Sequence, residues 1–195
     1  MSWRSSVLIG AAVAFIAGSG CTPKPQMVRL SPPVSTKASE TDRGSQTIGV
    51  AAFDVRPAQK LGIITDAHDH QVDVSTTGDT AAALYESVTQ ALGRAGFKSK
   101  PMGSDDPATL EVELRELTFS SLKQPLDYDT TLKVGVSAKA RNGNDSYERT
   151  FTVNQRKPDG APPSDAETTR MVNDALGIAL SDMLADQELA TLLSH

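Results

Sequence analysis

The sequence predicts an α+β fold in which two helices pack on a sheet of about four mainly antiparallel strands. Apolar residues recur at helical spacing in two segments, 79–95 and 164–184, and alternate with polar residues in segments between them. The predicted order is strand, helix, three strands, helix. Strands first separated by a helix and then joined by hairpins are typical of a two-layer domain, here assigned to residues 47–195.

The first predicted strand covers residues 47–55, a β-rich run that ends at Arg56-Pro57. Residues 58–78 have weak periodicity and contain three Asp and two His, which predicts a long surface loop. Within it, Gly62-Ile63-Ile64 is suited to a small strand. A loop of this length is unusual in a compact domain and indicates a functional surface.

A helix is predicted to begin at Asp79 or Thr80, either of which can cap it, and to end at Gly96. Its apolar residues are spaced by three and four positions and form one buried stripe, made of Ala81, Leu84, Val88, Leu92 and Ala95. Phe97 can fold back on the last turn, as in a Schellman ending.

Three strands are predicted to follow, over residues 109–119, 132–140 and 147–153. In the first, Leu114 and Leu117 fall on opposite parities of the alternation, which predicts a β-bulge near Arg115-Glu116. The other two flank Asn142-Gly143, residues that tolerate positive φ and favour a tight hairpin turn.

A second long helix is predicted to begin after Pro162-Pro163, where Ser164 and Glu167 have the spacing of a capping box. A wide apolar stripe follows, made of Val172, Ala175, Leu176, Ala179, Leu180, Met183 and Leu184. Leu189, Leu192 and Leu193 indicate a short terminal helical turn.

The first twenty residues have the three parts of a secretory signal peptide: a positive start at Arg4, an apolar run over 7–17, and small residues up to Gly20. The apolar run is shorter than the roughly 20 residues that a membrane-spanning helix needs. The sequence therefore predicts export and a signal peptide over residues 1–20.

Cys21, the single cysteine of the chain, directly follows this junction. A cysteine after small residues resembles the bacterial lipobox, although Gly18 stands where an aliphatic residue is usual. The favoured interpretation is lipidation of Cys21, with acyl chains that hold the protein at the bilayer. The other is ordinary cleavage, which leaves Cys21 as a free thiol. The residue after Cys21 is Thr22 and not the Asp that retains lipoproteins in the inner membrane. We therefore expect the protein to be anchored at the periplasmic face of the outer membrane.

Residues 21–46 are rich in Pro, Ser, Thr and Lys and show no sustained period, which predicts a flexible tether. Within this segment Met27, Val28 and Leu30 are suited to packing on the domain as a short edge segment.

The order and spacing of several short motifs resemble the YajG-type bacterial lipoproteins. They are the lipobox, Leu30-Ser31-Pro32, Asp54-x-Arg56, Ala95-Gly96-Phe97, Asn142-Gly143-Asn144, Val172-x-x-x-Leu176 and Leu180-x-x-Met183-x-x-Asp186. The resemblance covers nearly the whole chain. It implies an envelope location and a small α+β domain, and it supplies no catalytic residues.

Two groups of residues are candidates for a partner or ligand surface. His68 and His70, with Asp66, Asp69 and Asp73, form the one metal-like cluster, but a solvated polar loop is the favoured interpretation and no metal is assigned. Asp54 and Arg56 alternate along a strand and can share one face. They are suited to binding a partner, but an ion pair or loop anchor is the favoured reading.

The rest of the sequence argues against catalysis. Glu111 and Glu113 share a strand face like paired acids, but a solvated sheet surface with Arg115 beside them explains them. The chain has no Gly-x-Ser-x-Gly elbow and no Gly-rich phosphate loop. Its net charge of −5 excludes a basic field for nucleic acid. No cofactor is expected.

We therefore expect a non-enzymatic accessory or docking domain for an envelope protein or polymer. The alternative is a periplasmic glycan- or peptide-binding or hydrolytic domain that uses the 58–78 loop.

Overall fold

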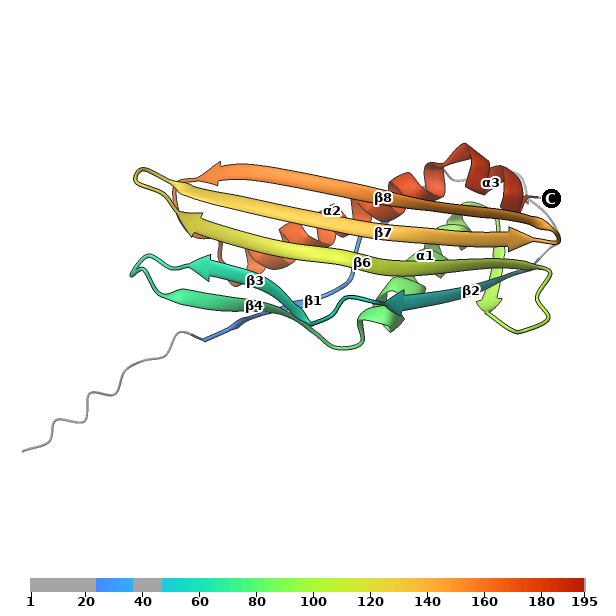
Figure 1. Cartoon of the computed structure of the whole chain (residues 1–195), viewed down its shortest axis with the longest axis horizontal. Helices are drawn as coiled ribbons and strands as arrows, with labels where there is room; N and C mark the ends of the chain where they lie inside the picture. The colour runs from blue at the N-terminus through green and yellow to red at the C-terminus, as the bar shows by residue number, and fades with distance from the viewer. Residues whose placement is uncertain (1–23, 37–46, 195) are drawn as a thin grey trace, which may run out of the picture.

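A computed structural model describes residues 24–36 and 47–194, which form eight strands and three helices (Figure 1). The strands are β1 (Gln26–Arg29), β2 (Thr47–Asp54), β3 (Lys60–Thr65), β4 (Gln71–Thr77), β5 (Lys98–Pro101), β6 (Ala108–Lys123), β7 (Tyr128–Asn142) and β8 (Asp145–Asp159). The helices are α1 (Thr80–Arg94), α2 (Asp165–Ala185) and α3 (Gln187–Leu193). The predicted signal peptide and Cys21 lie outside the described residues.

All eight strands belong to one mixed sheet organised around β6. One edge of β6 pairs antiparallel with β7, which pairs antiparallel with β8. The other edge is shared: β2 pairs parallel with it over Thr109–Leu114, and β3 pairs parallel with it over Phe119–Ser121. β5 extends the sheet beside β2, while β4 and then β1 extend it beside β3.

The predicted α+β two-layer domain with about four strands and two helices is therefore wrong. Most of the predicted surface loop, residues 58–78, lies in β3 and β4; the small strand predicted at Gly62-Ile63-Ile64 is part of β3. In β4 the buried residues Val72, Val74 and Thr76 alternate with polar ones, but the strand is short and its apolar pattern is weak. β4 pairs on one side with β3, the preceding strand, and on the other with β1, a segment distant in the sequence, and local periodicity does not report the second pairing.

The predicted bulge is confirmed, because the register of β6 against β7 shifts between Leu114 and Glu116. Leu114 and Leu117 are both buried as a result. Across the bulge stands Gly135, where a Cβ atom would lie 3.2 Å from the Glu116 Cβ. The absence of that atom leaves room for the extra residue in β6.

The predicted hairpin between β7 and β8 is also confirmed. Its turn residues are Gly143 and Asn144, because Asn142 and Asp145 still pair as the last residues of the two strands. Gly143 has a φ of 59°, which glycine adopts without strain.

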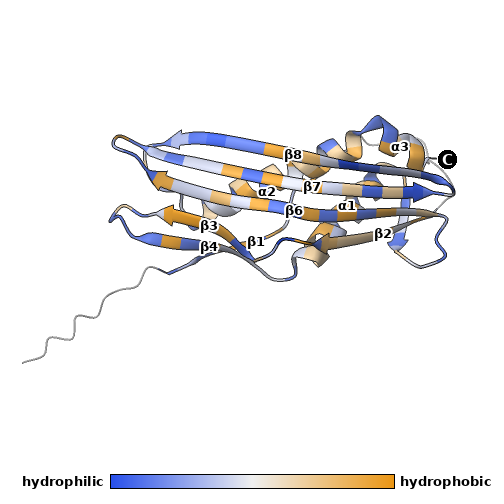
Figure 2. Ribbon diagram, viewed as in Figure 1, coloured by the Kyte–Doolittle hydropathy of each residue, from blue (hydrophilic) through white to orange (hydrophobic). Residues whose placement is uncertain are grey.

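The helices lie together behind the sheet in Figure 1. α1 contacts β2 and β5, α2 contacts β1, β7 and β8, and α3 contacts β7 and β8. Both predicted N-caps are present, since Asp79 accepts from the Ala82 N–H and Ser164 and Glu167 form a capping box. Figure 2 shows hydrophobic and hydrophilic residues alternating along the long strands, as expected for a sheet buried on one face.

Residues 24–36, within the segment predicted as a tether, lie against the domain. Val28 and Leu30 are buried in the core, whereas Met27 is exposed. Asn173 of α2 holds this segment from both sides: its side chain accepts from the Ser31 N–H at 2.6 Å and donates to the Arg29 carbonyl at 3.0 Å.

Candidate functional site

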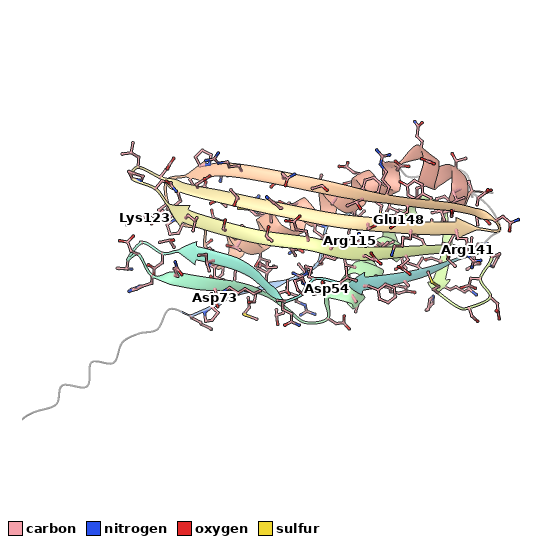
Figure 3. The ribbon with its side chains drawn as sticks, viewed as in Figure 1. Asp54, Asp73, Arg115, Lys123, Arg141 and Glu148 are labelled. Atoms are coloured by element: carbon pink, nitrogen blue, oxygen red, sulfur yellow. The ribbon has the colours of Figure 1, made fainter. Side chains whose placement is uncertain are left out.

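The residues predicted as a partner or ligand surface lie in two separate places. Asp54 is the last residue of β2 and lies near the middle of the sheet (Figure 3), and Arg56 follows two residues later. His68 and His70 lie in the turn between β3 and β4. On β6, Asp54 pairs with Leu114, and Ile64, which lies just before the turn, pairs with Ser121. The stretch of β6 between these two partners is roughly 20 Å long, which is the separation of the two places. The structure does not bring the four residues together.

Asp54 and Arg56 form a bidentate ion pair. Arg56 Nε donates to Asp54 Oδ1 at 2.8 Å and Arg56 Nη2 donates to Oδ2 at 2.7 Å. Nη2 also donates to the Thr76 hydroxyl of β4 at 3.2 Å. The Arg56 side chain is only 3% exposed, and the Asp54 side chain 21%. The pair thus links the end of β2 to β4 beneath the surface.

Two opposing effects set the pKa of Asp54. Burial of the carboxyl raises its pKa. The hydrogen bonds and the charge of Arg56, together with a hydrogen bond from Thr80 at the start of α1, lower the pKa by more than burial raises it. The pKa of Asp54 therefore lies below its ordinary value. Asp54 is therefore an ionised structural partner and is poorly suited to donate a proton at neutral pH.

A hollow of about 650 Å³ lies beside this pair. Phe53 and Val55, 45% and 49% exposed, lie in its wall together with the first residues of α1. Arg56 Nη1 is buried, with no hydrogen-bond partner among the residues that the structure describes. The lining of the hollow mixes apolar and polar residues, among them Arg56, whose charge is already balanced by Asp54.

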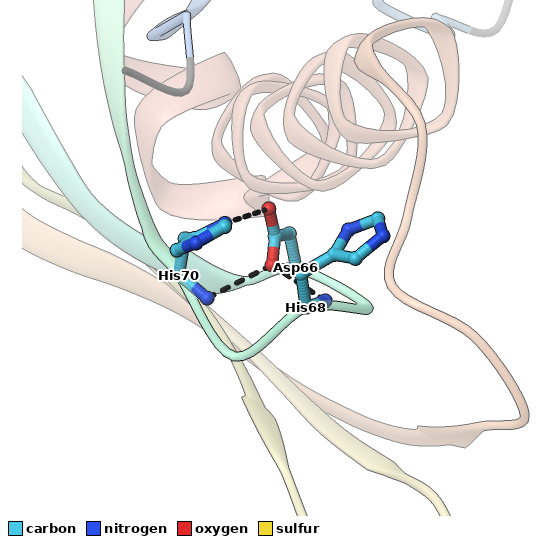
Figure 4. A group of neighbouring side chains, drawn as sticks. All are labelled: Asp66, His68 and His70. Carbon is cyan, nitrogen blue, oxygen red and sulfur yellow. Dashed lines mark hydrogen bonds and ion pairs between the residues drawn. The ribbon is translucent and has the colours of Figure 1, made fainter. Parts of the chain in front are cut away.

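The turn between β3 and β4 is organised by Asp66 (Figure 4). Its Oδ1 accepts the backbone N–H groups of His68 and His70 at 2.8 and 2.9 Å. Its Oδ2 lies 3.1 Å from His70 Nδ1. These contacts, the His70 backbone N–H above all, hold the pKa of Asp66 below its ordinary value.

The two histidines project from this turn into solvent. Their rings stack with centroids 6.1 Å apart and an angle of 26° between the planes. One side-chain ligand atom from each of Asp66, His68 and His70 can be chosen so that all lie within 4.8 Å of one another. The other two acids of the predicted cluster point elsewhere: Asp69 pairs with Lys123 at 2.8 Å, and Asp73 with Lys60 at 2.7 Å.

Sequence reasoning missed the neighbours that β6 and β7 bring to this turn. Lys123 lies at the end of β6, and the Tyr128 hydroxyl of β7 donates to the Asp66 carbonyl at 3.4 Å. No local signal marks these residues, because they are far from the turn in the sequence and approach it only through the pairing of β3 with β6.

Glu111 and Glu113 do not form a pair of catalytic acids. Glu113 contacts Lys139 at 2.6 Å and Arg115 at 3.0 Å, and Glu111 contacts the same lysine at 3.5 Å. The hydrogen bond from Lys139 is the largest influence on Glu113 and lowers its pKa. A carboxyl held ionised in this way is a poor general acid.

Comparison with protein families gives a match to the family described as uncharacterized lipoprotein, over residues 32–194. The chain belongs to this lipoprotein family. The predicted resemblance to YajG-type lipoproteins is thereby confirmed. No curated protein matches the chain. Among the described residues, no helix is long and apolar enough to cross a membrane.

Solved structures show the same general fold at low sequence identity. Protein XCC0632 from Xanthomonas campestris is 15% identical with a TM-score of 0.56, covering 86% of this chain and 95% of that one. An uncharacterized protein is 10% identical with a TM-score of 0.50, covering 82% and 96%. A minor lipoprotein from Acinetobacter baumannii is 12% identical with a TM-score of 0.39, covering 76% and 92%, too distant a likeness to support an argument.

Proposed function

We propose that this protein is an outer-membrane lipoprotein whose periplasmic domain docks on an envelope protein or polymer and catalyses no reaction. In this proposal, residues 1–20 are removed and Cys21 carries the acyl chains. The observation that carries it is the lipoprotein family match over residues 32–194, joined to a solitary cysteine directly after a signal-like segment.

An anchor at Cys21 would stand close to the domain. Cys21 precedes Gln26, the first residue of β1, by five residues, and so short a chain spans at most about 18 Å when fully extended. Gln26 pairs with Val74, and β1 runs parallel to β4. The chain therefore enters β1 from the end of the sheet that carries the turn between β3 and β4, and we propose that this end lies near the bilayer.

The docking surface proposed here is centred on Phe53 and Val55. Both are close to half exposed. Phe53 pairs with Glu113, so it lies on the face of the sheet opposite the buried residues Val50 and Val112. Asp54 lies between Phe53 and Val55 in the chain, and Arg56 follows Val55. The ion pair of Asp54 with Arg56 holds this strand end in place. Exposed apolar side chains on a fixed backbone are suited to contact a partner.

Capture from detergent-solubilised envelopes tests docking. The wild-type chain should recover a specific partner, and Phe53→Ser with Val55→Ser should lose it. Leu126→Ser is the matched control, because Leu126 is 98% exposed in the turn between β6 and β7 and its loss should leave capture unchanged. Equal recovery by all variants, or no specific partner at all, would refute docking through this surface.

Labelling with radioactive palmitate tests the anchor. The wild-type chain should incorporate the label and sediment with outer membranes, whereas Cys21→Ser should do neither. Label in the Cys21→Ser variant would show that the anchor lies elsewhere.

The alternative function loses its structural basis. Glycan or peptide binding, or hydrolysis, depends on a long loop over residues 58–78, but most of these residues form β3 and β4.

A further inference from the structure

Two atoms in the turn between β3 and β4 already have the spacing of neighbouring metal ligands. Zinc bonds to nitrogen and to carboxylate oxygen are about 2.0–2.2 Å long, so adjacent ligands of a tetrahedral ion lie roughly 3.3 Å apart. Asp66 Oδ2 and His70 Nδ1 are 3.1 Å apart. An ion can therefore take the place of the proton that these atoms share, with the imidazole proton moved to Nε2.

Asp66 is held ready for this role by the backbone of its own turn. Oδ1 accepts two backbone N–H groups, which fixes the carboxylate and leaves Oδ2 directed at His70. Asp69 adopts a φ of 65°, a conformation that folds the turn tightly enough for these contacts. Hydrogen bonds that orient a ligand in this way raise metal affinity, because the ligand loses little freedom on binding.

His68 supplies a third ligand at small cost. One of its ring nitrogens lies within 4.8 Å of a carboxylate oxygen of Asp66 and of a ring nitrogen of His70, and the side chain is exposed and able to rotate. A movement of about 1.5 Å brings that nitrogen to ligand spacing. The exposed side of the group leaves a fourth position for water.

We propose that Asp66, His68 and His70 bind one divalent transition-metal ion of the zinc class at the tip of the hairpin formed by β3 and β4. Two imidazole nitrogens and one carboxylate oxygen suit zinc, nickel and copper better than calcium or magnesium, which prefer oxygen ligands. The site is independent of the lipid anchor and of docking, because all three ligands belong to one turn.

Calorimetric titration of the untagged full-length chain in non-ionic detergent micelles tests the proposal. The background carries His195→Ala, so that His68 and His70 are the two histidines present. Zinc chloride should bind as one ion per chain, and magnesium chloride should give no heat at the same concentrations. His68→Ala, His70→Ala and Asp66→Asn should each weaken zinc binding by at least about tenfold, since each removes one of three ligands.

Asp69→Asn is the matched control. It removes one negative charge from the same turn, and asparagine tolerates the positive φ of this position. Because the Asp69 carboxylate contacts Lys123 and is not a ligand, zinc affinity should change by less than about threefold. The proposal is overturned if the His68→Ala, His70→Ala double variant binds zinc as tightly as its parent, if the parent gives no heat, or if Asp69→Asn weakens binding as much as Asp66→Asn.

Discussion

Two acid–base motifs of this chain share the same alternating spacing and have opposite surroundings. Asp54-x-Arg56 lies where β2 ends, with Thr76 of β4 against the guanidinium and the Arg56 side chain 3% exposed. Asp66-x-His68-x-His70 lies in a turn, with the His70 side chain 57% exposed. The first motif is enclosed by its own neighbours, whereas in the second the two histidine side chains are exposed, although His70 Nδ1 contacts Asp66.

This difference separates a stabilising contact from a candidate binding site. Removing either member of a buried ion pair leaves the other charge uncompensated, so the Asp54–Arg56 pair is expected to be costly to break. The turn histidines contact little else, so their loss is expected to affect binding and not folding. The following four predictions test this contrast, from the largest expected effect to the smallest.

Arg56→Met should lower the free energy of unfolding by about 3 kcal/mol, because it removes the partner of a largely buried carboxylate. Urea denaturation of the full chain in detergent measures this change. Arg156→Met is the matched control: Arg156 makes the same bidentate contact with Asp129, at 2.7 and 2.8 Å, but its side chain is 75% exposed. A control that destabilises as much as Arg56→Met would show that burial does not set the difference.

Asp54→Asn should cost about 2 kcal/mol at neutral pH, since it removes charge-assisted hydrogen bonds and keeps the side-chain shape. The pKa of Asp54 is lowered in the folded state, so the stability that its charge contributes is complete above the unfolded pKa of about 3.9 and is lost as the pH falls through the folded value.

The gap between wild type and Asp54→Asn should therefore be constant from pH 7 to about pH 5 and narrow below about pH 4. Denaturation curves collected from pH 7 to pH 2.5 measure it. A gap that widens in acid would mean that Asp54 is not ionised in the folded protein at neutral pH.

Thr76→Val should cost about 1 kcal/mol. The Thr76 hydroxyl accepts from Arg56 Nη2 at 3.2 Å and donates to the Gln59 carbonyl at 3.2 Å, and the residue is 1% exposed. In the Arg56→Met background the same substitution should cost less, because one of its two hydrogen bonds is already lost. Equal costs in both backgrounds would show that the two side chains are not coupled.

His68→Ala with His70→Ala should leave the free energy of unfolding unchanged within about 0.5 kcal/mol in metal-free buffer. Added zinc should raise the melting temperature of the parent and not that of the double variant, because an ion that binds only the folded state stabilises it. A large loss of stability without metal would make these histidines structural.

Local chemistry was enough to predict several elements. Asp79 and Ser164 cap their helices through hydrogen bonds made within one turn. The β7–β8 hairpin depends on Gly143, and the bulge at Glu116 is visible as a change of parity along β6. Each of these features depends on residues that are neighbours in the chain, so the sequence reports them directly.

Short strands could not be predicted in the same way. β4 and β5 contain few apolar residues, and each pairs with a segment far away in the sequence, β4 with β1 and β5 with β2; for β1, the packing of Val28 and Leu30 on the domain was predicted. β6 is long enough to hold both β2 and β3 along one edge, and no local pattern encodes that sharing. Export and lipidation of Cys21 stay predictions, because that part of the chain lies outside the described residues.

The sequence by itself determined the family, the two long helices with their caps, and the alternating acid–base motifs. Only the tertiary structure decided which motif is covered. β4 and the start of α1 are brought against Arg56 and Asp54 by strand pairing around β6, whereas Asp66, His68 and His70 stay at a hairpin tip. The physical reason is that burial depends on contacts between residues distant in the chain. Both motifs place their residues two positions apart, so this spacing does not distinguish the buried motif from the exposed one.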